Sequence, residues 1–432
     1  MANLGAKRIA RLQNQRAGIV ASLDIGCSKT TCLIARPDIA SPRRMHVLGS
    51  GRQQTRGFTG GTITDMEGLE RTIRLAVEDA EREAGEPISE VILGISGPHV
   101  AAHLTEAAIE PGGRAISQRD LKRLHALAVS KVPNKTADLL AAWPVVYTID
   151  KAAGRVRRPV GMIASGLHVR MAAVTAPRAV VRNLVECVGR AHLGVRQLVP
   201  SAIAAGAGTL IDDEIENGTI CIDMGAGVTA VSVFLNGAPA WLGLVPAGGA
   251  HVTADLAQGL GTTFAAAERL KGLYGTADLE GTGLSERIEA ARLGDDGRLH
   301  ASRIERRELA RIIAPRIEET FELVRRLLDK SDVRKVLPHR VVLTGGASQL
   351  PGVREIAGRH LRAPVRMGRP VMAEFLGETL ATPAFSTPSG LLIYSELGFS
   401  DAATAGSGGP EESGAPGSGW MNEAFRWLKE NF

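Results

Sequence analysis

Hydrophobic and polar positions follow short periods along most of the chain, and they predict strands alternating with amphipathic helices. The apolar run at 19–25 ends at Gly26 and resumes at 30–35, which predicts a β-hairpin. A second hairpin is predicted at 219–234, where glycines interrupt the apolar run in the same way. Buried strands are predicted at 91–95, 195–199 and 341–344, and helices at 66–83, 118–129, 179–191, 252–275, 303–330 and after Pro351.

The two predicted hairpins can be superimposed. Asp24 matches Asp223 and Thr30 matches Thr229, with the same offset of 199 residues. A repeat of this length is too long for a solenoid unit. It predicts two similar halves that face one another.

Length and composition allow a multidomain globular protein. The 432 residues suffice for two to four units, at roughly 100–200 residues each. Hydrophobic residues make up 44% and charged residues 22%, which is ordinary for a soluble protein. We find no apolar run long enough for a transmembrane helix and no secretory signal pattern, so we expect a cytoplasmic protein. Four scattered cysteines lack metal-ligand spacing and are predicted to be unpaired thiols: Cys27, Cys32, Cys187 and Cys221.

The net charge of +5 is concentrated at the N-terminus. Residues 1–17 contain Lys7, Arg8, Arg11 and Arg16 and no acidic residue. Because the rest of the chain is nearly balanced, nucleic-acid binding is not expected. The segment is predicted to be a solvated, disordered arm, and a contact with anionic lipid is the alternative.

The glycine turns of the two hairpins have the composition of phosphate sites. Glycine permits close backbone approach, and successive amides form a concave anion site. Ser28, Thr30 and Thr229 could add hydroxyl donors. Asp24 and Asp223 would repel phosphate directly, and they make sense if they hold hydrated Mg²⁺. Each turn alone could be structural, but two matching copies favour nucleotide binding.

Further motifs narrow the class of protein. The chain lacks G-x-x-x-x-G-K-[ST], which excludes a P-loop enzyme, and lacks a strand-to-helix G-x-G-x-x-G, which argues against a dinucleotide fold. The motifs that remain are Asp24-Ile-Gly, Asp223-Met-Gly-Ala-Gly-Val-Thr229 and Leu343-Thr-Gly-Gly-Ala-Ser348. Their order resembles the actin, sugar kinase and DnaK-type ATPase superfamily. With the segment around Pro159-Val-Gly161 and the C-terminal tail, the chain most closely resembles the FtsA family of bacterial cell division proteins.

The resemblance implies an α/β protein with a two-lobed actin-like ATPase fold. Its halves would be duplicated mixed sheets, with an FtsA-type subdomain inserted in the first lobe. The implied divisions are a first-lobe core (18–100, 177–208 and 385–400), an inserted subdomain (101–176), a second-lobe core (209–246 and 335–384) and its outer subdomain (247–334).

ATP and Mg²⁺ are implied in the cleft between the lobes, with Asp24 and Asp223 holding Mg²⁺ through water. The implied phosphate-binding residues are Gly26, Cys27, Ser28, Lys29, Thr30, Gly225, Ala226, Gly227, Val228 and Thr229. The implied base and ribose contacts are Gly248, Gly249, Glu268, Lys271, Gly345, Gly346, Ala347 and Ser348. For Lys29 the alternative is a solvent-facing lysine, and for Glu268 and Lys271 it is a solvated helix face.

Hydrolysis is expected to be slow. Fast hydrolysis needs a side chain that positions the attacking water. Residues 200–210, near the crossover between the halves, contain no Gln, Glu or His. We therefore expect at most a slow ATPase, in which ATP acts mainly as a conformational ligand.

The C-terminal tail has a different composition from the rest. Residues 401–418 are rich in Gly, Ser, Ala and Pro and predict a flexible linker. Placed on a helix, the apolar residues of 419–432 occupy an arc of about 160°, opposite the charged ones. The predicted lipid contacts of this amphipathic helix are Trp420, Met421, Phe425, Trp427, Leu428 and Phe432. Docking on this protein or on a partner protein is the alternative.

The family resemblance implies a protein that polymerises and tethers the FtsZ ring to the cytoplasmic face of the inner membrane, at the division site. It would also recruit later division proteins. Arg316, in an arginine-rich predicted helix, is the one candidate contact for the acidic FtsZ C-terminal peptide, and a solvated charged face is the alternative. Other possible functions are a sugar or acyl kinase, a pilus-assembly ATPase and a DnaK-type chaperone.

Overall fold

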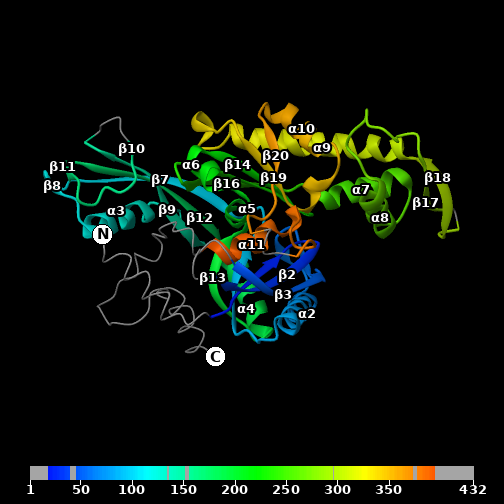
Figure 1. Cartoon of the computed structure of the whole chain (residues 1–432), viewed down its shortest axis with the longest axis horizontal. Helices are drawn as coiled ribbons and strands as arrows, with labels where there is room; N and C mark the ends of the chain where they lie inside the picture. The colour runs from blue at the N-terminus through cyan, green and yellow to red at the C-terminus, as the bar shows by residue number, and fades with distance from the viewer. Residues whose placement is uncertain are drawn as a thin grey trace.

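Two five-stranded sheets form the centre of the molecule (Figure 1). A computed structural model describes residues 18–38, 45–133, 136–150, 155–294, 296–372 and 377–394. The first sheet has the order β13 (Gly194–Pro200), β6 (Glu90–Ile95), β1 (Val20–Ile25), β2 (Lys29–Pro37), β3 (Met45–Gln54). The second has the order β20 (Val365–Met367), β19 (Val341–Thr344), β14 (Thr219–Met224), β15 (Thr229–Leu235), β16 (Ala238–Val245).

The two sheets have the same topology. In each, three antiparallel strands are followed by two strands that pair in parallel. The hairpin registers also match, since Ile25 pairs with Thr30 and Met224 pairs with Thr229. The prediction of duplicated mixed-sheet halves is therefore confirmed.

Helices with one apolar face cover the outer sides of the sheets. In the first lobe, α2 (Met66–Ala84) packs on β3, and α4 (Arg178–Arg190) packs beside it. The second lobe carries α6 (Asp212–Asn217), α7 (Gly249–Leu260), α8 (Phe264–Tyr274), α9 (Arg306–Asp329) and α10 (Val353–Leu361). Short helical turns are η1 (Arg334–Val336), η2 (Gly346–Gln349) and η4 (Pro383–Phe385).

Two predicted helix boundaries were wrong. The segment 252–275 is not one helix, because Gly261 adopts a left-handed conformation (φ 60°) that ends α7, and Thr263 caps the start of α8. Residues 303–305 belong to β18 (Leu299–Glu305), which pairs with β17 (Arg287–Leu293) at the outer tip of the second lobe (Figure 1).

Two buried helices cross between the sheets. α5 (Ser201–Thr209) packs on β14 and β15, and α11 (Ser386–Ile393) packs on β1, β2 and β6. Glycines permit the close crossing: a Cβ built on Gly390 would lie 1.7 Å from the Ala204 carbonyl oxygen. Because each helix leaves one lobe and packs against the other, this crossing joins the two halves.

The inserted subdomain extends to the opposite end of the molecule from β17 and β18 (Figure 1). Its sheet has the order β10 (Arg155–Val156), β9 (Ala137–Ile149), β12 (Leu167–Pro177), β7 (Ala101–Ile109). Helix α3 (Gln118–Val129) covers this sheet, and β8 (Arg114–Ala115) pairs with β11 (Ile163–Ala164) in the same subdomain. In the first lobe, β4 (Phe58–Thr59) pairs with β5 (Thr62–Ile63). The subdomain also contacts the second lobe, because Trp143 donates to the Pro239 carbonyl and Arg157 pairs with Glu216.

Several predictions fall outside the described residues. These are the basic arm 1–17, the linker 401–418 and the amphipathic helix 419–432. Within the described ranges, none of the helices combines the length and apolar content of a bilayer-spanning segment. All four cysteines are free, as predicted.

Candidate functional site

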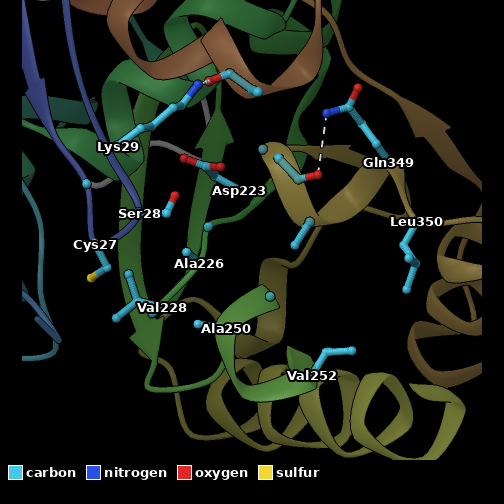
Figure 2. A pocket seen from close by; sticks show the side chains of 18 of the residues that line it. Cys27, Ser28, Lys29, Asp223, Ala226, Val228, Ala250, Val252, Gln349 and Leu350 are labelled. Carbon is cyan, nitrogen blue, oxygen red and sulfur yellow. Dashed lines mark hydrogen bonds between the residues drawn. The ribbon is translucent and has the colours of Figure 1, made fainter. Parts of the chain in front are cut away.

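A cavity of about 1000 Å³ lies between the lobes. Both hairpin turns line it, together with η2, part of α8 and the segment that leads into α11. Figure 2 shows Lys29 and Asp223 in one part of this cavity, and Gln349 and Leu350 on the far side.

The two hairpin turns have the same backbone hydrogen bond. Gly26 N–H donates to the Lys29 carbonyl at 3.0 Å, and Gly225 N–H donates to the Val228 carbonyl at 3.0 Å. The turns also meet across the cavity, since a Cβ built on Gly227 would lie only 2.6 Å from Cys27 Sγ. Two glycine turns that face one another can enclose a phosphate chain with backbone amides.

The two threonines that follow these turns require a correction. Thr30 is fully buried and its hydroxyl bonds that of Thr55 at 2.9 Å. Thr229 is also fully buried and donates to the Ala247 carbonyl at 2.8 Å. Their hydroxyls stabilise the hairpins instead of facing the cavity, so we do not retain them as phosphate donors.

Asp24 and Asp223 end equivalent strands and both line the cavity. Burial, followed by repulsion from Asp223, raises the pKa of Asp24 to about 7. Burial also raises the pKa of Asp223, although the Thr387 hydroxyl donates to its carboxylate at 2.8 Å and opposes the shift. The pair therefore consists of two poorly solvated carboxyl groups, each of which resists ionisation.

These carboxylates fit a hydrated Mg²⁺ ion. Carboxylate oxygens are hard ligands, and Mg²⁺ usually keeps several waters and uses only one or two carboxylates. Among the described residues, no group of three or more His, Cys, Asp or Glu could enclose a metal directly. A bound cation would relieve the repulsion that raises the pKa of Asp24.

Lys29 points into the cavity and not into solvent (Figure 2). Its Nζ donates to the Ala384 carbonyl at 2.6 Å and lies 4.0 Å from the centre of the Phe385 ring. Burial lowers the pKa of Lys29 to about 8, while Asp24 opposes the shift. The alternative of a solvent-facing lysine was therefore wrong.

At the far side of the cavity, Glu268 and Lys271 form an ion pair of 2.7 Å. Lys271 Nζ also donates to the Gly249 carbonyl at 2.9 Å, and its side chain is only 16% exposed. Lys271 is thus held beside Gly249, the first residue of α7, instead of lying on a solvated helix face. Gly346 and Ala347 line the same part of the cavity.

Two predicted contacts lie behind the cavity wall. Ser348 is buried and its hydroxyl donates to the Gly345 carbonyl at 2.8 Å. Gly248 packs on the second turn, because a Cβ there would lie 2.5 Å from the Gly225 carbonyl oxygen. Both residues shape the wall instead of presenting a group to a ligand.

Sequence reasoning missed several lining residues. Thr387 and Ser201 both line the cavity from the two crossing helices. Thr387 reaches Asp223 over a sequence separation of 164 residues, for which no local pattern gives a signal. The other missed polar lining residues are Gln54, Thr55, Ser96, Arg306 and Gln349.

Arg316 lies on α9 and is already paired. Its Nε and Nη2 donate to the two Asp255 carboxylate oxygens at 2.5 and 3.0 Å, and Nη1 pairs with Glu319. These hydrogen bonds raise the pKa of Arg316. An acidic peptide would have to displace Asp255 to form the same bidentate hydrogen bonds with Arg316.

Two family models match the chain. The model "Cell division protein FtsA" matches residues 220–390, and "SHS2 domain inserted in FTSA" matches residues 97–175. A cell division protein FtsA from Agrobacterium fabrum is 39% identical over the full chain and 98% of its own length. Those of Neisseria meningitidis and Escherichia coli K12 are 33% and 28% identical, covering 97% and 96% of this chain and 100% and 98% of their own.

Solved structures share the fold at low identity. A chain of the PilM-PilN type IV pilus biogenesis complex gives a TM-score of 0.60 at 17% identity, covering 87% of this chain and 98% of its own. MreB5 of Spiroplasma citri bound to ADP gives a TM-score of 0.53 at 12% identity, covering 88% and 96%. The actin-like ATPase fold predicted above is therefore confirmed.

Proposed function

Because the chain belongs to the cell division protein FtsA family, we propose that its cavity binds ATP with Mg²⁺ and that the bound state supports its assembly at the division site. The observation that carries the proposal is the pair of matching glycine turns, each preceded by an aspartate, on opposite walls of one cavity.

The nucleotide would lie with its phosphates between the turns and its base toward η2 and α8. Backbone amides of the turns and Lys29 would bind the phosphates, and Asp24 and Asp223 would hold Mg²⁺ through water. The proposed phosphate contacts are Gly26, Cys27, Ser28, Lys29, Gly225, Ala226, Gly227 and Val228. The proposed base and ribose contacts are Gly249, Glu268, Lys271, Gly345, Gly346 and Ala347.

Equilibrium titration of the full chain tests this proposal. We expect saturable ATP binding that weakens when Mg²⁺ is chelated. GTP is the matched control for base recognition, and sugars and short acids are offered as phosphate acceptors. Failure to bind ATP would contradict the proposal, whereas rapid phosphorylation of an acceptor would favour the kinase alternative.

We also propose that residues 419–432 form the membrane anchor, reversible for one chain and strengthened when chains polymerise. Liposome co-sedimentation of the full chain and of 1–418, with and without ATP, tests this. Phe425→Glu, on the apolar arc, should abolish pelleting, while Glu423→Gln on the charged arc should not. Equal pelleting of the full and truncated chains would place the anchor elsewhere, with residues 1–17 first in line.

Binding to the acidic C-terminal peptide of FtsZ is proposed at α9, with Arg316 as the contact. Fluorescence anisotropy with that peptide should show weaker binding for Arg316→Ala than for Arg325→Ala, a more exposed arginine of the same helix. Equal effects would argue for a diffuse charged surface. Recruitment of later division proteins by residues 101–176, at the cytoplasmic face of the inner membrane, completes the proposal.

A further inference from the structure

The Lys29 ammonium is held by the short segment that leads into α11. Its Nζ donates to the Ala384 carbonyl at 2.6 Å and lies 4.0 Å from the centre of the Phe385 ring. Both partners belong to η4, and Phe385 is only 3% exposed. A cation is attracted to the face of an aromatic ring, most strongly where water is excluded, so these two contacts define one position for the ammonium.

The segment η4 is itself fixed to the second lobe. The Pro383 carbonyl accepts from the Gly345 N–H at 3.1 Å and from the Thr344 hydroxyl at 3.2 Å. Thr344 ends β19, so these hydrogen bonds tie η4 to the edge of the second sheet. A lysine side chain has a long flexible stem, whereas the Phe385 ring is buried on this anchored support. The segment therefore gives Lys29 a defined place that its own side chain does not enforce.

The two cavity carboxylates compete for the same lysine. Asp24 and Asp223 both attract Lys29 electrostatically, and such attraction is strong in a poorly solvated site. The hydrogen bond of Lys29 nevertheless goes to Ala384. Thr387, two residues after Phe385, donates to the Asp223 carboxylate at 2.8 Å. Residues 383–387 thus hold the cation and one of the carboxylates separately.

We propose that Phe385 is a positioning residue, whose ring face keeps the Lys29 ammonium off the carboxylates and oriented toward the phosphates of ATP. The inference rests on the proposed function. An ammonium has three N–H donors and Ala384 accepts from one, which leaves donors for phosphate oxygens. A lysine that is already placed loses less side-chain freedom when the ligand binds, so Phe385 strengthens ATP binding without touching the nucleotide. Asp24 and Asp223 then stay available for hydrated Mg²⁺.

Equilibrium ATP titration of the full chain tests the proposal, with Phe385 alone replaced by pentafluorophenylalanine. Fluorination leaves the ring nearly the same shape but removes the negative face that attracts a cation. We expect ATP affinity to fall about fivefold, as for the loss of one desolvated cation–π contact. Mg²⁺ affinity in the presence of ATP should fall as well, because the released ammonium moves onto the carboxylates.

Phe321 is the matched control. It is a fully buried ring in α9, outside the cavity lining. Its replacement by pentafluorophenylalanine makes the same chemical change in a core position and should leave both affinities unchanged.

A double-mutant cycle separates positioning from packing. Phe385→Leu removes the ring together with packing volume, so it should weaken ATP binding and also lower the melting temperature. In a Lys29→Ala background neither Phe385→Leu nor the fluorinated residue should weaken ATP binding further, since no ammonium remains to be placed. The lower melting temperature of Phe385→Leu should persist in that background.

Two results would overturn the inference and leave the proposed function intact. An equal loss of ATP affinity in both backgrounds would show that the ring acts through packing. Unchanged or tighter ATP binding in the fluorinated protein would show that the ring does not orient Lys29 toward the ligand. Absence of ATP binding by the wild-type chain would overturn the inference and the proposed function together.

Discussion

The two hairpin turns share a backbone and differ in side chains. Each begins two residues after an aspartate and is closed by the same 3.0 Å hydrogen bond. The first turn carries Cys27, Ser28 and Lys29, whereas the second carries the small or apolar Ala226, Gly227 and Val228. Duplication thus preserved the amide cradle, while charge and polar side chains remain on one side only.

The aspartates differ in the same manner. Asp223 receives a hydrogen bond from Thr387, and Gly345 leaves room for its carboxylate, since a Cβ there would lie 2.2 Å from Oδ1. Asp24 lies beside Gly94 instead, where a Cβ would be 3.4 Å from its Oδ1. We interpret the second turn as a fixed wall and the first as the side that interacts chemically with the ligand. Four experiments can break or sharpen this comparison.

The largest effect is expected at the charged position of the first turn. Lys29→Ala should weaken ATP binding by about 10–100-fold, because hydrogen bonds to charged groups contribute about 1.5–3 kcal/mol. Val228→Ala, at the equivalent position of the second turn, should change the affinity less than twofold. Equilibrium titration measures both, and equal losses would refute the division of roles.

The next effect concerns pH. Since the pKa of Asp24 is raised to about 7, protons compete with Mg²⁺ below that pH. Mg²⁺ affinity in the presence of ATP should fall about fivefold from pH 7 to pH 6 if one proton is displaced. Asp24→Asn should bind Mg²⁺ more weakly and lose this pH dependence.

The raised pKa of Asp24 also determines the direction in which folding stability changes with pH. Between pH 3.8 and 7 the unfolded chain ionises Asp24 while the folded chain keeps the proton, so ligand-free stability should fall over this window and level off above it. Thermal melts of wild type and Asp24→Asn check this, and identical profiles would contradict it.

The smallest effect is expected at Thr387. Thr387→Val removes the hydrogen bond to Asp223 and should weaken Mg²⁺-dependent ATP binding about threefold, as expected for a single neutral-donor bond. Thr387→Ser should retain the affinity. A loss in Thr387→Ser as large as that in Thr387→Val would indicate that packing, and not the hydroxyl, holds the carboxylate.

Local signals explain which elements could be predicted. Helix α2 ends at Gly85 in a left-handed conformation, and α3 begins at a Ser117 capping box, so both were located within one residue. The matching hairpins were found because their glycine turns interrupt apolar runs in the same way. The break at Gly261 was missed because the apolar period continues across it.

The parts of the site that depend on tertiary packing could not be predicted. Ser201 meets Gly94 because β13 pairs with β6 in the first sheet, and Thr387 meets Asp223 only where α11 crosses between the lobes. The buried orientation of the hydroxyls of Thr30 and Thr229 likewise depends on partners elsewhere, Thr55 and Ala247. The family resemblance supplied the fold and the cleft, but it carried no information on these pairings.

Helix α11 has a consequence for the order in which the protein folds during synthesis. It completes the first lobe, where the Ser22 hydroxyl donates to the Pro388 carbonyl across 366 residues. At about 5–20 residues per second, β1 leaves the ribosome roughly 20–70 s before its covering helix is made. All five strands of the first sheet, by contrast, lie within residues 20–200 and are made well before α11. We therefore expect the nascent chain to expose the apolar groove on β1 and β2 until translation is nearly complete.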